Sequence, residues 1–282
     1  MHLPLRRVDI DFSGVPFQWN PERPALSTAA NAVSWAAVVF ERRLCDAFRE
    51  AMPDITDPAL VSEAENFIAQ EATHSRVHRS HIKALVGMHP ALDGLVAELD
   101  ALAEARLRDL PLLDRLAFGS MVEGALAPLG RYLVAEREKL FRGSDARVSA
   151  LFLWHFSEEI EHRSTALKLY RHMGGTWRGR IRAAWATRKL QRDGAGLIRE
   201  RFRTAFPDAD YGFPELPVGL PLLRLAWGLF KSLAPGHDTG GRAMPIWARQ
   251  YLHTIRLGVG PVEAWLGSTE MERSRVIGAR AA

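Results

Sequence analysis

Two short stretches decide the fold of this chain: Glu71–Ala72–Thr73–His74 and Glu159–Ile160–Glu161–His162. Residues three apart on a helix lie one above the other, so each stretch places a carboxylate and an imidazole on one helical face. Two further glutamates, Glu41 and Glu123, interrupt apolar faces, one ahead of each stretch. This order of carboxylates and imidazoles is typical of a four-helix bundle that binds two metal ions in its core.

Helical patterns dominate on both sides of these stretches. Apolar residues recur at spacings of three and four, and the alternation typical of strands is almost absent. We therefore predict four long helices, over residues 24–51, 58–86, 111–140 and 146–173. A long connection, residues 87–110, lies between the second and third helices and contains a short helical stretch over 92–108.

The predicted fold class is all-α. A long crossover between the second and third helices is typical of a ferritin-like four-helix bundle, predicted here over residues 24–173. Residues 1–23 are an N-terminal extension, and residues 174–282 form a helical region that packs on the bundle. In that region we expect helices near 178–206, 222–232 and 245–257, with Trp185, Trp227, Trp247 and Trp265 packing against the bundle.

Glu41 and Glu123 are the single carboxylates on their helical faces. A buried, unpaired carboxylate costs several kcal/mol, so Glu41 needs a cation or a proton, and either a metal ion or an arginine at a helix–helix seam would supply the cation. Glu123 lies among small residues, including Gly119 and Gly130. Small neighbours indicate either close helix packing or a cavity left for a substrate.

Additional histidines and glutamates accompany the two Glu-x-x-His steps. His78 lies one turn beyond His74, where it could support a ligand, carry a proton or be an extra ligand. His81, one turn further, is expected to face solvent. His155 and Glu158 share the stripe of Glu159 and His162. Of the neighbouring carboxylates, Glu159 is preferred as the ligand because it matches the three-residue step of the second helix.

The predicted metal ligands are Glu41, Glu71, His74, Glu123, Glu159 and His162. Four carboxylates and two imidazoles suit iron best among the metals considered, with manganese or zinc as alternatives. We assign supporting or proton-handling roles in catalysis to His78, His155 and Glu158. Cys45, one turn from Glu41, is expected to be a small core residue.

Composition excludes several other classes of protein. A single cysteine rules out an internal disulfide, and the first residues lack the apolar core of a signal peptide, so a cytoplasmic location is expected. No apolar run reaches the roughly 18 residues of a membrane span. A net charge of +4 indicates no nucleic-acid partner. Peripheral membrane contact and a homodimer remain possible interactions.

The sequence also resembles a known family. The stretches FIAQEATHSRVHR (residues 67–79) and WHFSEEIEHR (residues 154–163) are similar to the bacterial family labelled "predicted metal-dependent hydrolases". The resemblance covers about residues 25–173, and it implies a ferritin-like ligand pattern. The label itself implies no particular substrate.

Three functions fit these observations. The first is an O2-dependent oxidase or oxygenase, in which two metal ions, most simply iron, act on a small, hydrophobic or lipid-like organic substrate. The second is a dinuclear hydrolase, in which the metals activate water, as the family label says. The third is a non-enzymatic metal-binding protein. We expect the first, because the chain has no serine-nucleophile or phosphate-binding motif.

Overall fold

The computed structural model describes residues 3–236 and 243–266, and every regular element within them is a helix. The all-α prediction is therefore confirmed for the part of the chain that is described. Four helices form the centre of the fold: α1 (Pro24–Ala51), α2 (Pro58–Met88), α4 (Leu112–Ala135) and α6 (Ala146–His162). Contacts join α1 to α2, α4 to α6, α1 to α4 and α2 to α6, so the four helices enclose a common interior.

Local chemistry sets where these helices begin. Pro24 and Pro58 each start a helix at a position where a missing N–H costs nothing. The Asp57 side chain accepts a hydrogen bond from the backbone N–H of Ala59, and Asp145 caps α6 in the same way through the N–H of Arg147. Both Glu-x-x-His steps therefore lie on helices with defined N-termini.

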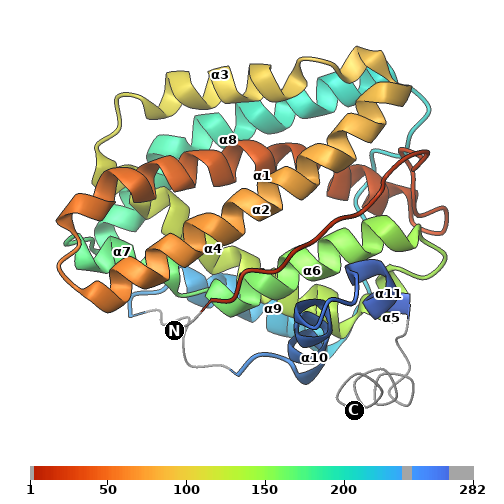
Figure 1. Cartoon of the computed structure of the whole chain (residues 1–282). Coiled ribbons are helices and arrows are strands. Elements are labelled where there is room, and N and C mark those ends of the chain that lie inside the picture. Colours follow the sequence, from red (N-terminus) through yellow and green to blue (C-terminus); the bar gives the residue numbers. More distant parts are fainter. Residues whose placement is uncertain (1–2, 237–242, 267–282) are drawn as a thin grey trace, which may run out of the picture.

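The crossover between α2 and α4 has the predicted helical content. The short 3-10 helix η2 (Pro90–Leu92) leads into α3 (Leu95–Leu107), which packs on α1 and on α8 (Trp177–Ala205). Figure 1 shows α3 and α8 side by side along the flank of the bundle formed by α1. The crossover thus adds a second layer of helices to one side of the central four.

Two of the predicted long helices are interrupted. The third ends at Ala135 and resumes as α5 (Arg137–Leu140), although it runs through Pro128 without ending there. The fourth divides into α6 and α7 (Thr165–His172) directly after His162. Arg163 and Ser164 occupy this break, and Thr165, the first residue of α7, donates its hydroxyl to Glu63 of α2. The predicted single helix over 146–173 is therefore wrong at this point.

Gly130 explains how closely α4 and α6 pack. A Cβ atom added at Gly130 would lie 2.6 Å from the carbonyl oxygen of Phe156, closer than real Cβ contacts allow. Only glycine permits this approach, which brings the α4 backbone against the helix that carries Glu159. Close packing, one of the two alternatives raised by the small residues around Glu123, is therefore present on this side of α4.

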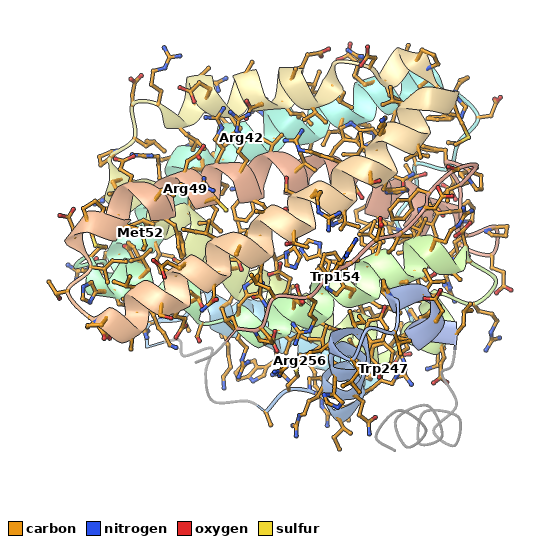
Figure 2. The ribbon with its side chains drawn as sticks, in the orientation of Figure 1. Arg42, Arg49, Met52, Trp154, Trp247 and Arg256 are labelled. Carbon is orange, nitrogen blue, oxygen red and sulfur yellow. The ribbon has the colours of Figure 1, made fainter. Side chains whose placement is uncertain are left out.

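The C-terminal region packs on the bundle in part. Helices α9 (Leu220–Ser232), α10 (Ile246–Arg256) and α11 (Pro261–Leu266) contact α4, α6 or each other. Trp247 is buried and Trp265 packs against it, as predicted, whereas Trp185 and Trp227 are 64% and 52% exposed, so the prediction is wrong for these two. Figure 2 shows Trp247 on α10 and Trp154 on α6. The glycine-rich sequence from Gly236 to Gly241 predicts a loop, but residues 237–242 lie outside the described residues.

Residues 3–23, which belong to the predicted N-terminal extension, form an extended segment. They run along α6 and over the seam with α2, drawn in dark red in Figure 1. Val8, Ile10 and Phe12 are buried in the same apolar cluster as Val77 and most of α6. The guanidinium of Arg76 donates to the carbonyl oxygen of Val8 at 2.7 Å, which fastens the segment to α2. No helix among the described residues is long and apolar enough to cross a membrane.

Candidate metal centre

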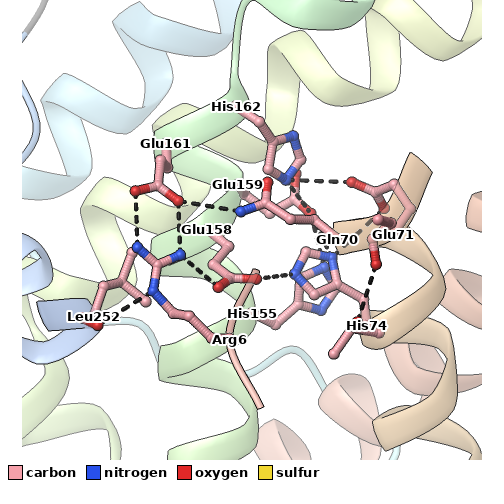
Figure 3. Close-up of polar contacts among 12 residues, drawn as sticks. Arg6, Gln70, Glu71, His74, His155, Glu158, Glu159, Glu161, His162 and Leu252 are labelled. Atoms are coloured by element: carbon pink, nitrogen blue, oxygen red, sulfur yellow. Dashed lines mark hydrogen bonds and ion pairs between the residues drawn. The ribbon is translucent and has the colours of Figure 1, made fainter. Parts of the chain in front are cut away.

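The predicted ligands converge in the interior of the bundle. Helix α1 supplies one of them, α2 two, α4 one and α6 two, and none is more than 3% exposed. The six are Glu41, Glu71, His74, Glu123, Glu159 and His162. Figure 3 shows the α2 and α6 members facing each other across the seam between these helices.

Glu71 and Glu159 connect the two Glu-x-x-His steps. The Glu71 carboxylate lies 3.5 Å from His74 Nδ1 and 3.3 Å from His162 Nε2. Glu159 Oε1 lies 3.6 Å from the same atoms of the two histidines. Ligand atoms from Glu71, His74, Glu159 and His162 all fall within 4.8 Å of one another, which is the spacing that a shared metal site requires.

A second group of donors adjoins the first. Ligand atoms of Glu41, His78 and His155 also lie within 4.8 Å of one another. His155 Nε2 is 2.8 Å from Glu159 Oε1 and 3.5 Å from Glu41 Oε1, so it lies among the carboxylates. His155 is predicted to have a supporting role, and its position would also allow it to bind a metal ion.

Glu123 lies at the α4 side of the centre. Its Oε2 atom is 3.5 Å from His162 Nδ1, and neither of its carboxylate oxygens accepts a hydrogen bond. Glu41 Oε2, both oxygens of Glu71, Glu159 Oε2, His74 Nδ1 and both ring nitrogens of His162 are also without a hydrogen-bond partner. Buried polar atoms are rarely left unsatisfied, so the concentration of such atoms here marks a site for cations.

Glu158 and Glu159 are adjacent but face different partners. Glu158 Oε2 lies 2.9 Å from His74 Nε2, and its other oxygen accepts a hydrogen bond of 2.7 Å from Arg6. The carboxylate of Glu158 is thus fully engaged on the far side of the His74 ring, where it orients that ring. Glu159 instead points its oxygens into the cluster. This geometry agrees with the preference for Glu159 as the ligand.

Arg6 helps Glu158 to hold the ring of His74, and no pattern in the sequence predicted this role of Arg6. Its guanidinium donates to Glu158, to both oxygens of Glu161 and to the carbonyl oxygen of Leu252. Gln70 on α2 also donates to Glu161 and to the carbonyl oxygen of Pro4. Arg6 lies in an extended segment without helical periodicity, so no spacing pattern relates it to α6.

We expect Arg6→Met to destabilise the protein strongly. The substitution leaves Glu158 buried without its cation, and breaking a buried ion pair costs about 3–5 kcal/mol. For a chain of this size the melting temperature should fall by roughly 5–15 °C in thermal unfolding. Arg7 is exposed, so Arg7→Met is the matched control and should change little. Equal melting temperatures for the two variants would contradict the role given to Arg6.

A chain of buried polar groups leads away from His155. His78 Nε2 lies 2.6 Å from His155 Nδ1, and the other nitrogen of His78 lies 3.0 Å from the Ser34 hydroxyl. The same hydroxyl lies 3.4 Å from His81 Nδ1. His81 is fully buried, so the prediction that it faces solvent is wrong. The extended N-terminal segment covers it, with the ring of Phe12 against its imidazole.

We expect His78→Ala to weaken metal binding without removing it. His78 holds the ring of His155 in place, and loss of such a supporting hydrogen bond typically lowers metal affinity about 10–100-fold. Competition with a calibrated chelator measures this change. His78→Gln keeps a hydrogen-bonding side chain and should recover part of the affinity, while exposed His253→Ala should have none of the effect. An unchanged affinity in His78→Ala would show that His155 needs no support.

Burial and mutual repulsion set the protonation of the centre. Burial, followed by the charge of Glu71, raises the pKa of Glu41 well above its usual range. Burial and Glu159 raise the pKa of Glu123 in the same way. Burial opposes ionisation of Glu159, but His162 and His155 hold its pKa well below the usual range. Without metal, the cluster therefore retains protons on some carboxylates.

The histidines divide into two groups. Burial works against their charge, yet neighbouring glutamates, Glu71 for His74 and Glu159 for His162, raise the pKa of both residues above the usual value. Burial lowers the pKa of His78 and His155, and burial brings that of His81 to about 4. His78, His155 and His81 are thus neutral near pH 7. The other two histidines, in the Glu-x-x-His steps, hold protons that a metal ion must displace.

Cys45 has the environment of a core residue. It is buried, and its thiol donates to the carbonyl oxygen of Ile68 at 3.8 Å. Burial and nearby Glu71 raise the pKa of the thiol, which keeps it protonated and unreactive.

Comparison with known proteins adds one finding. A family model described as "predicted metal-dependent hydrolase" matches residues 4–191. The match begins before Arg6 and extends into α8, so it is wider than the resemblance over residues 25–173. Searches of curated proteins and of solved structures each gave no match. The chain belongs to the family of predicted metal-dependent hydrolases.

Proposed function

We propose that this protein is a dinuclear metalloenzyme with a ferritin-like arrangement of helices around the metal centre. The observation that carries the proposal is the set of buried, unsatisfied carboxylate and imidazole atoms contributed by four helices. Leaving such groups unpaired costs about 1–3 kcal/mol each, and more when they are charged. Two divalent cations would satisfy them together.

The residues present fit two hard or borderline metal ions. All donors are oxygen or imidazole nitrogen, since the thiol of Cys45 binds Ile68 instead. Glu71 and Glu159 each contact both His74 and His162, so either carboxylate would be available to hold a metal ion together with these histidines. Iron or manganese suits four carboxylates with two or three imidazoles, and zinc is a further candidate.

The surrounding residues hold the ligands and exclude water. Arg6 and Glu158 fix the ring of His74, and His78 fixes that of His155. Trp154 packs its ring against His74, with centroids 5.0 Å apart, and Phe67 covers His162 at 4.9 Å. Bound metal ions would supply Lewis acidity toward water and, if redox-active, electrons for dioxygen.

Hydrolysis is the reaction that the family description favours. In this reading the bound metals would activate water toward an ester, amide or phosphoester. The donor set favours a second candidate, oxidation with O2, because its carboxylate-rich composition suits iron. A metal-binding protein without catalysis is the third outcome.

One experiment separates these functions. Metal-free protein is reconstituted anaerobically with Fe(II), Mn(II) or Zn(II), and the bound metal is counted. Each form is then assayed against model esters, amides and phosphoesters, and its O2 consumption is recorded on exposure to air. Hydrolysis by the zinc or manganese form supports the first candidate, and O2 uptake by the iron form alone supports the second. Fewer than two metal ions per chain in every form would refute a dinuclear centre.

A further inference from the structure

A long cleft runs along the side of the bundle away from the metal centre. It has a volume of about 800 Å³ and is lined by α1, α3, α4 and α8. Its lining residues on α1 extend from Ala25 to Glu50, which at about 1.5 Å per residue is roughly 35 Å. The volume falls within the range of small-molecule sites, about 300–1,000 Å³.

The walls of the cleft are apolar over most of its length. A row of small side chains on α1, Ala25, Ala29, Ala32 and Ala36, faces larger apolar residues of α3, α4 and α8. Small residues along one wall leave a continuous space, whereas bulky side chains there would fill it. A narrow apolar space of this length matches a linear hydrocarbon chain better than a compact ring system.

Most charged lining residues gather at the end of the cleft near Glu50, where they form ion pairs, and the remaining one, Arg199, is exposed on α8. Arg115 binds Glu50 at 2.7 Å, and Arg43 binds Glu104 and Asp100. Because these charges are already paired, this end of the cleft is polar but has no unpaired charge among these residues to bind an ionic ligand. The occupant that fits is therefore an uncharged chain with at most a small polar end.

Leu44 and Gly119 form the part of the wall nearest the metal centre. Both line the cleft, and Leu44 lies one turn after Glu41 while Gly119 lies one turn before Glu123. A Cβ atom added at Gly119 would overlap Cδ1 of Leu44, so the leucine fills the space that the glycine leaves. Each of these two wall residues is thus one helical turn away from a carboxylate of the metal centre.

We propose that this cleft binds a linear, uncharged hydrocarbon chain, such as the alkyl part of an ester or alcohol, and presents one end of it to the metal centre past Leu44 and Gly119. Presentation of the chain end to the metal centre rests on the proposed function, whereas binding in the cleft does not. Binding in the cleft concerns α1, α3, α4 and α8, so it can be tested without any metal. The small residues around Glu123 indicated either close packing or a cavity for a substrate. On the side of α4 that faces α1, they line a cavity.

The first test measures binding to metal-free protein. The neutral fluorophore N-phenyl-1-naphthylamine reports occupation of an apolar site, and 1-dodecanol should displace it whereas 1-butanol should not. Ala36→Trp narrows the cleft and should weaken dodecanol binding at least tenfold. Exposed Ala72 on α2 does not line the cleft, so Ala72→Trp is the matched control. Equal dodecanol affinity in both variants would overturn the proposal.

The second test asks whether the chain reaches the metals. Bound Mn(II) broadens the NMR signals of nearby protons, so one end of bound dodecanol should broaden in Mn(II)-loaded protein and stay sharp with Zn(II). Leu44→Ala should increase this broadening, and Gly119→Val should reduce it while dodecanol still binds. Uniform or absent broadening with normal Mn(II) content would refute delivery to the centre. Absent Mn(II) would instead count against the proposed function, leaving the binding result to stand by itself.

Discussion

Glu159→Gln should remove metal binding, whereas Glu158→Gln, one residue earlier, should leave two metal ions per chain. The Glu159 carboxylate lies within 3.6 Å of His155, His74 and His162, so it belongs to the first group of donors and contacts the second through His155. Glutamine keeps the shape of the side chain but provides only one neutral oxygen. Elemental analysis after loading and desalting measures the result.

The neighbouring variant makes this prediction specific. Glu158 is equally buried and equally close to His74, but its oxygens are bound by Arg6 and by the outer nitrogen of the ring. Its loss should lower metal affinity by about 10–100-fold, as expected for a supporting residue, while saturating metal restores full occupancy. Loss of metal from Glu158→Gln with retention in Glu159→Gln would reverse the assignment of these two residues.

Metal loading should stabilise the protein by an amount that grows with pH. At a metal concentration of 100 times Kd, one site contributes about 2.7 kcal/mol, which is roughly 5–10 °C in the melting temperature of a chain of this size. Thermal unfolding of loaded and metal-free protein at about pH 7 and pH 8.5 tests the prediction. Glu159→Gln, which should not bind metal, is the control.

The sign follows from the groups with raised pKa. Glu41 and Glu123 keep protons in the folded, metal-free protein that they lose on unfolding, and so do His74 and His162. The stability that such groups add is complete below their unfolded pKa and is lost as pH rises through the folded pKa. Metal-free protein should therefore become less stable between about pH 7 and 8.5.

The other histidines do not reverse this trend. The pKa values of His78, His155 and His81 are lowered in the folded protein. These residues therefore take up protons on unfolding mainly below about pH 6.5, which lies outside this window. In loaded protein the metal has already displaced the protons, which removes the slope. A metal-free protein whose melting temperature rises from pH 7 to 8.5 would contradict the assigned protonation states.

Helical periodicity explains why most of the centre could be predicted from sequence. A carboxylate on an otherwise apolar helical face has few physical explanations, and the three-residue step relates Glu71 to His74 without knowledge of the fold. The same reasoning gave the ends of α1 and the capped start of α2, because proline and aspartate act locally. These effects act between residues that are close together in the chain, so they can be predicted from the sequence alone.

Long-range contacts explain what the sequence did not reveal. Arg6 reaches Glu158 from an extended segment with no repeating pattern, and burial of His81 depends on Phe12 of that same segment. The role of His155 depended on whether its ring faced Glu41, which is a property of packing between α1 and α6. The break after His162 likewise reflects tertiary contacts, since Thr165 binds Glu63 of α2.

The hydrogen bond from Arg6 to the carbonyl oxygen of Leu252 has a consequence for biosynthesis. Residue 252 leaves the ribosome roughly 10–50 s after residue 6 at typical rates of translation. Once residue 162 has been made, the helices that carry the ligands are complete, but until residue 252 follows the guanidinium that neutralises Glu158 lacks one of its partners. The nascent chain therefore passes through a stage in which the support of Glu158 by Arg6 is incomplete.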